Sequence, residues 1–142
     1  MSMRTLLIGA AALTIALAAA VPVATAAPTD TPPKGKDCWA THYGQPGLDG
    51  QPTSSGEPYN NNADAAATSL SRSPQLKFGT KVKVTNVKNG KTLTVRINDR
   101  GSYKWTASVP KCLDLTDGAF KRLGGSVDPD DGHIIVREQV LG

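Results

Sequence analysis

The sequence predicts an all-β fold with one or two short helices, in which short strands close into a small barrel. The main observation is Phe78 to Gly101, where two runs of alternating apolar and polar residues flank Asn89-Gly90. Asn-Gly is the dipeptide most typical of a two-residue hairpin turn. The second observation is the number of further short alternating segments, which brings the total to five or six strands. Since one hairpin cannot bury its own apolar face, closure into a barrel would bury it and remove the sheet edges.

The hairpin register follows from the predicted turn. If Lys88 faces Lys91, the apolar residues of the two arms lie opposite each other on one face, as the pairs Val84–Val95 and Val82–Ile97. The same register sets Lys83 against Arg96, which is an unfavourable pair of like charges. Asp99 shares the parity of the buried residues, so the pattern predicts a carboxylate in an inward-facing row.

The segments before the hairpin begin with an expected signal peptide over residues 1–26, which carries Arg4, an apolar stretch and a small-residue cleavage site after Ala26. A retained signal anchor is the alternative. Residues 27–37 are rich in Pro, Thr and Lys and predict a flexible segment, and residues 38–142 predict one domain. In that domain we expect a strand over Cys38–Tyr43, a turn-rich loop over Gly44–Gly56, and a helix or a strand over Asp64–Leu70.

The segments after the hairpin alternate between loops and short elements. Thr116 is typical of an N-cap and Gly124 of a helix stop. We expect a loop over Ser102–Lys111, a strand over Cys112–Leu115, a helix over Asp117–Leu123, a turn over Asp128–Gly132 and a strand over His133–Leu141.

The charge of the chain excludes some partners. The formal net charge is +4, and it falls to +3 without Arg4. Because the basic residues are scattered along the sequence, we expect no nucleic-acid partner, and attraction to an acidic glycan or protein surface would be nonspecific. With the signal peptide removed we expect a secreted, extracellular monomer that no membrane segment holds.

The two cysteines, Cys38 and Cys112, lie near opposite ends of the predicted domain. Outside the cell they are expected to pair, and a bridge over roughly 75 residues would stabilise the fold by about 4 kcal/mol. The alternative is a reactive thiol, which would oxidise there. Pairing leaves no cysteine nucleophile, and no Gly-X-Ser-X-Gly elbow offers a serine nucleophile.

Neither metal nor cofactor is expected. His42 and His133 lack ligand spacing and are interpreted as surface or strand histidines. Asp128, Asp130 and Asp131 lack the twelve-residue pattern of a calcium loop.

Several aromatic and amide side chains are candidates for contact with a partner. Trp39 is expected to pack on the cystine bridge, whereas the loop residues Tyr103 and Trp105 have no reason to be core. The candidates for partner contact are Tyr43, Gln45, Tyr59, Tyr103 and Trp105. Four residues in segments expected to be mobile could be crosslinked by an extracellular transglutaminase: Gln45, Gln51, Lys34 and Lys36.

A set of short motifs resembles a known family. The motifs are Tyr43-Gly44, Gly56-Glu57, Phe78-Gly79-Thr80, Val82 to Asn86, Asn89-Gly90, Val95 to Gly101 and Leu113-Asp114-Leu115. Together they resemble the rare lipoprotein A family, which belongs with barwin and the expansins. The resemblance covers roughly Ala40 to Leu141 and implies a six-stranded double-psi β-barrel.

The same resemblance implies site residues. In the peptidoglycan-cleaving members a glutamate, an aspartate and a histidine line the site, and these positions fall on Glu57, Asp99 and Thr68. Threonine cannot carry a proton at neutral pH as imidazole can. Catalysis is therefore not expected; if the protein is an enzyme, Asp99 and Glu57 would act. The alternative role for Asp99 is to cap backbone amides or to pair with Arg100 or Arg96.

Two functions are consistent with this resemblance. The chain is similar to small secreted actinobacterial inhibitors of papain-like cysteine proteases, which implies a rigid barrel that blocks a papain-like or trypsin-like protease with the loops Gly44–Gly56 and Ser102–Pro110. The alternative is a lytic transglycosylase or a cell-wall glycan-binding protein that uses Glu57 and Asp99.

Overall fold

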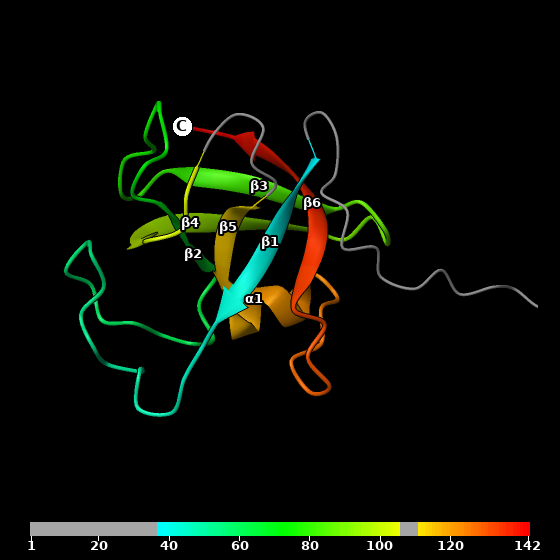
Figure 1. Ribbon diagram of the computed structural model, residues 1–142, viewed down its shortest axis with the longest axis horizontal. Helices are drawn as coiled ribbons and strands as arrows, with labels where there is room; N and C mark the ends of the chain where they lie inside the picture. Colours follow the sequence, from blue (N-terminus) through cyan, green and yellow to red (C-terminus); the bar gives the residue numbers. More distant parts are fainter. Residues whose placement is uncertain (1–36, 106–110) are drawn as a thin grey trace, which may run out of the picture.

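The structure is a computed structural model that describes residues 37–105 and 111–142 (Figure 1). In the described chain the strands form one closed barrel in the order β1-β5-β2-β4-β3-β6. The prediction of an all-β barrel with a short helix is confirmed. The elements are β1 (Asp37–Tyr43), β2 (Ala65–Ser69), β3 (Lys81–Asn86), β4 (Thr92–Gly101), β5 (Lys111–Thr116), α1 (Asp117–Arg122) and β6 (His133–Val140).

Two parallel strand pairs give the barrel its topology. β1 pairs with β5 and β2 pairs with β4 in parallel, whereas β2 and β5 join the two pairs in antiparallel fashion. β6 lies between β1 and β3 and closes the ring, as Figure 1 shows. The segment Asp64–Leu70, for which the sequence predicted either a helix or a strand, contains strand β2. All five residues of β2 are buried. Burial in the barrel therefore outweighs the helix preference of its three alanines.

The hairpin between β3 and β4 has the predicted faces but not the predicted register. Val82 pairs with Val95, and Val84 pairs with Leu93. The two-residue turn was wrong: the loop spans residues 87–90, and only Gly90, with φ of 74°, has a positive φ there. A shift of two residues preserves the parity of every side chain, so the predicted buried valines and Ile97 are fully buried.

Two asparagines hold the longer turn, through hydrogen bonds inside the hairpin and to the end of α1. Inside it, Asn86 Oδ1 accepts from the Lys88 backbone N–H and Asn89 Oδ1 accepts from the Lys91 backbone N–H, each at 2.9 Å. Asn86 Nδ2 donates to the carbonyl oxygen of Leu123 at 2.8 Å, and Asn89 Nδ2 donates to the same oxygen at 3.1 Å. Both amides thus bind the end of α1 and fix the turn around it. In the observed register Lys83 faces Thr94, and Lys81 is the residue that faces Arg96.

A β-bulge interrupts β4 beside β2. The pairing passes from Ile97–Ala66 to Asp99–Ala67, so Asn98 is an extra residue. The bulge ends the inward-facing row at this point, and Asp99 is half-buried on the outside. The prediction that Asp99 continues the inward-facing row was wrong, because parity holds only in an unbroken ladder.

Helix α1 closes one end of the barrel, and its predicted cap is confirmed. Thr116 Oγ1 accepts a hydrogen bond from the backbone N–H of Ala119 at 3.1 Å, and Gly124 has φ of 94°. Phe120 and Leu123 are fully buried in the core with the barrel residues. Among the described residues, no helix has the length and apolar character needed to cross a membrane.

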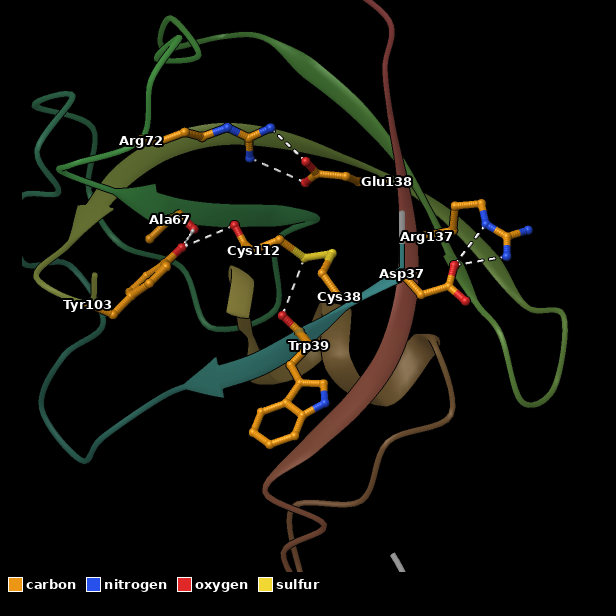
Figure 2. The surroundings of a disulfide bond; sticks show 9 residues. All are labelled: Asp37, Cys38, Trp39, Ala67, Arg72, Tyr103, Cys112, Arg137 and Glu138. Atoms are coloured by element: carbon orange, nitrogen blue, oxygen red, sulfur yellow. Dashed lines mark hydrogen bonds and ion pairs between the residues drawn. A yellow bond between two sulfur atoms is a disulfide. The ribbon is translucent and has the colours of Figure 1, made fainter. Parts of the chain in front are cut away.

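The predicted disulfide joins β1 to β5 (Figure 2). Cys38 and Cys112 have an S–S distance of 2.05 Å and a Cα–Cα distance of 5.7 Å. The ring of Trp39 does not pack on the bridge as expected. It turns away from the sulfurs in Figure 2 and stacks on His133 at a centroid distance of 4.1 Å.

Candidate functional site

Asp99 is the centre of the candidate site. It lies near the end of β4, and its carboxylate accepts three hydrogen bonds: from Tyr43 Oη at 3.1 Å, from the Ser54 backbone N–H at 2.9 Å and from the Arg100 backbone N–H at 2.8 Å. These donors come from the end of β1, from the loop after it and from β4 itself. The carboxylate therefore caps two backbone N–H groups, which is one of the alternative roles predicted for Asp99.

A row of paired residues crosses four neighbouring strands beside Asp99. Asp114 on β5 and Asp99 on β4 are both partners of Ala67 on β2. Two strand spacings separate their Cα atoms by roughly 10 Å. The row consists of Thr41, Asp114, Ala67 and Asp99. Asp114 accepts a hydrogen bond from Thr41 Oγ1 at 2.8 Å.

Asp114 was not predicted as a site residue. The signal was present, because a polar residue between the inward-facing Leu113 and Leu115 must face outward. What the sequence lacked was the position of β2 between β5 and β4, which brings Asp114 near Asp99.

Two of the predicted contact tyrosines flank this row, and the third is buried. Tyr103 Oη lies 3.0 Å from the carbonyl oxygen of Ala67 and is half-buried. Tyr43 is also half-buried, and its ring centroid lies 5.1 Å from that of Tyr59. Tyr59 is only 4% exposed, so its side chain supports the loop from inside and is not available to a partner. Burial raises the pKa of all three tyrosines, so each phenol stays protonated and can donate.

The other predicted contact and crosslinking residues lie in different places. Trp105 is half-buried, packs against the core and carries the guanidinium of Arg72 at 4.5 Å from its ring. Gln45 and Gln51 are exposed. The remaining predictions lie outside the described residues: the signal peptide over residues 1–26, Lys34, Lys36 and the end of the loop over residues 106–110.

Glu57 is bound to an arginine. Arg96 Nη2 donates to Glu57 Oε2 at 2.6 Å, and Arg96 Nη1 donates to Oε1, so the ion pair is bidentate. The hydrogen bonds from Arg96 hold the pKa of the Glu57 carboxyl below its usual range, and the same contact raises the pKa of Arg96. Glu57 is therefore a carboxylate at neutral pH and holds no proton to donate.

His42 contributes a second polar cluster, which the sequence did not predict. Its Nδ1 lies 2.7 Å from Asp117 Oδ1, and its Nε2 lies 2.8 Å from Asp130 Oδ1. The ring packs on Phe120 with a centroid distance of 4.6 Å. The partners lie 75 and 88 residues away, so no local pattern reveals them.

One cluster of possible metal ligands occurs among the described residues, formed by Cys38, Cys112 and Glu138. The two sulfurs are bonded to each other, and neither is a thiolate that could bind a metal. The structure therefore offers no argument for a metal at this position.

Comparison with known proteins identifies the family. Residues 37–137 match the family model described as lytic transglycolase, whose domain is the double-psi β-barrel. The chain belongs to the lytic transglycolase family.

Relatives of this family carry a consistent name. A probable endolytic peptidoglycan transglycosylase RlpA of Synechocystis sp. is 40% identical over 121 residues, which cover 83% of this chain and 35% of the relative. A probable enzyme of the same name from Nostoc sp. is 43% identical over 106 residues, covering 72% and 25%. The endolytic peptidoglycan transglycosylase RlpA of Campylobacter jejuni is 40% identical over 103 residues, covering 72% and 33%. The aligned part is thus about a third or less of the length of these relatives.

A solved structure was also found. The Streptomyces papain inhibitor aligns with 76% of this chain and 98% of its own, with a TM-score of 0.48 and 19% sequence identity.

One position departs from the lytic transglycolase pattern that the resemblance implies. Thr68, where the histidine is expected, is fully buried on β2. Its Oγ1 donates to Gln75 Oε1 at 2.9 Å and accepts from Arg100 Nη1 at 3.0 Å. This hydroxyl belongs to a fixed polar cluster and cannot carry a proton at neutral pH.

Proposed function

We propose that this lytic transglycolase domain binds the glycan strands of peptidoglycan around Asp99 without cleaving them. Support for the substrate class comes from the family and from the names of relatives that are 40–43% identical to the chain. Because the chain spans about a third or less of the length of those relatives, both the substrate and the activity are proposals for this chain.

The observation that carries the proposal concerns the two positions, besides Asp99, at which cleaving members of the family have their glutamate and histidine, here Glu57 and Thr68. Cleavage of a glycosidic bond needs a group that protonates the leaving oxygen. Glu57 is held as a carboxylate by Arg96, and Thr68 is buried between Gln75 and Arg100. Neither supplies the proton, and this favours binding over cleavage.

The row beside Asp99 has the groups that a glycan needs. Carboxylate oxygens of Asp99 and Asp114 accept hydrogen bonds from sugar hydroxyls. The half-buried ring of Tyr43 flanks the row and offers an apolar face on which a sugar ring can pack. The ring of Tyr103 lies against Gly101 and carries the Lys111 ammonium at 4.2 Å from its centroid, so it contributes its position beside the row and not a free face.

The test is cosedimentation of the purified protein with peptidoglycan stripped of its attached polymers. Asp99→Asn is expected to lower the bound fraction at least fivefold. Asp128→Asn, the same chemical change at an exposed position, is the control and is expected to bind like the unaltered protein. Thermal unfolding of both variants checks that the fold is intact.

Two outcomes of this test would overturn the proposal. The first is an unaltered protein that stays in the supernatant. The second is release of soluble muropeptides that Asp99→Asn abolishes, which would establish cleavage in place of binding.

An extracellular location, which binding to peptidoglycan requires, is consistent with the disulfide. A disulfide forms and persists outside the cytoplasm, and Cys38–Cys112 fits an extracellular protein. The secretion signal itself remains a prediction, which N-terminal sequencing of the exported protein would test.

Inhibition of papain-like proteases is the second candidate function, and one observation favours it. The predicted binding loop Gly44–Gly56 is shaped in advance by backbone hydrogen bonds, such as Gly50 N–H to Tyr59 O at 2.9 Å and Thr53 N–H to Glu57 O at 2.8 Å. A preformed loop loses less entropy on binding. Titration of papain with the protein tests this function, and full papain activity at micromolar protein would end it.

A further inference from the structure

The barrel gathers basic residues that are scattered in the sequence onto one outer face. Along β3 the buried valines point inward, so Lys81, Lys83 and Thr85 point outward. The strands on either side add their own outward-facing residues through the observed registers. We call this surface the lysine face, and it consists of Lys81, Lys83, Thr85, Thr92, Thr94, Arg96, Arg137 and Gln139.

The lysine face has no acidic residue of its own. Carboxylates from outside the face pair with its arginines but not with its lysines. Lys81 is the direct partner of Arg96 across the strands, and such like-charged pairs are ordinarily unfavourable. The two arginines at its edges are bound, Arg96 by Glu57 and Arg137 by Asp37. Lys81 and Lys83 lie on the central strand, and no carboxylate of the described residues is within ion-pair distance of either.

The remaining positive charge selects for a type of ligand. Both arginine forks are occupied, so bidentate recognition of a carboxylate or a phosphate by arginine is not available on this face. Two ammonium groups remain, and a lysine binds phosphate as a point charge. Their Cα atoms are about 6.7 Å apart along an extended strand, and threonine hydroxyls and the Gln139 amide surround them.

We propose that the lysine face binds an anionic cell-wall polymer with repeating phosphodiester groups. An exposed, polar strand surface with two free cations is complementary to an extended chain of negative charges and hydroxyls. The disulfide is typical of an extracellular protein, so a polymer of the cell wall is a partner that the protein can reach. The inference rests on the proposed function only in locating the protein at the cell wall.

The test measures binding of poly(glycerol phosphate) by calorimetry at several salt concentrations. In Lys81→Gln/Lys83→Gln the dissociation constant is expected to rise at least tenfold. The salt dependence should also weaken by about one released counterion per lysine removed. Lys104→Gln/Lys121→Gln removes the same charge elsewhere on the exposed surface and is expected to change the constant less than twofold.

Three results would overturn the inference: no binding, equal losses in the two double variants, or equally tight binding of a DNA oligonucleotide or of polyglutamate. Asp99→Asn separates this inference from the proposed function. It is expected to bind poly(glycerol phosphate) normally, so loss of peptidoglycan binding alone would leave the lysine face in place.

Discussion

His42 Nδ1 lies 2.7 Å from Asp117 Oδ1, and the other nitrogen of the same ring lies 2.8 Å from Asp130 Oδ1. A neutral imidazole has a single N–H, so only the protonated ring can donate to both carboxylates. Burial lowers the pKa of His42, but the hydrogen bonds and charges of Asp130 and Asp117 together outweigh it and raise the pKa above 6.5.

This cluster predicts a pH dependence of stability. A raised folded-state pKa contributes stability that is fully present below 6.5 and is lost as the pH rises through the folded-state value. We expect the free energy of unfolding to fall over that window in the unaltered protein and to fall less in Asp130→Asn. Urea unfolding at closely spaced pH values measures it, and identical curves for the two proteins would contradict the prediction.

The disulfide predicts a large loss on removal. It joins residues separated by 74 positions. Its removal restores conformational entropy to the unfolded chain and is expected to lower the free energy of unfolding by about 4 kcal/mol. The double variant Cys38→Ala/Cys112→Ala is expected to melt roughly 20 °C lower, at about 4–8 °C per kcal/mol. Calorimetry gives the difference, and a fall of less than a few degrees would show that the bridge constrains little.

The cap of α1 predicts a graded pair of variants. Thr116 Oγ1 accepts from Ala119 N–H at 3.1 Å and donates to Ala63 O at 2.5 Å. Thr116→Ala removes both hydrogen bonds and is expected to cost about 2 kcal/mol. Thr116→Ser keeps the hydroxyl and should recover most of that loss. Chemical denaturation compares the two, and equal losses would assign the effect to the methyl group.

The two ion pairs on β6 predict unequal costs when they are broken. Arg72 and Glu138 form an ion pair in which the two side chains are only 8% and 14% exposed. In the ion pair between Arg137 and Asp37, the arginine side chain is 59% exposed. Glu138→Gln leaves a buried guanidinium without its counter-charge and is expected to cost about 3 kcal/mol. Asp37→Asn should cost less than about 1 kcal/mol. Similar costs by urea unfolding would disprove the distinction.

Local patterns predicted the faces of the hairpin but not its register. Any even shift keeps Val82 and Val84 inside, so alternation alone cannot distinguish the registers. The observed register is held by Asn86 and Asn89, whose side chains bind backbone N–H groups of the turn and also the carbonyl oxygen of Leu123 in another part of the chain. For the same reason the strand identity of Ala65–Ser69 depended on burial by neighbours and not on its composition.

The site was predictable in part. The motifs named Asp99 and Glu57, and the capping role of Asp99 was among the alternatives. The partners that decide their chemistry lie far away in sequence: Glu57 is 39 residues from Arg96, and Tyr43 is 56 residues from Asp99. The lysine face was missed because basic residues on three strands look dispersed until the strand order is known.

Strand β6 has the first and third strands of the chain as its neighbours. Until residues 133–140 are present, the ring has a gap, and both β1 and β3 expose unpaired backbone groups that could recruit foreign strands. Assembly of this domain therefore finishes only after its last strand has been synthesised, and fragments that end earlier should aggregate.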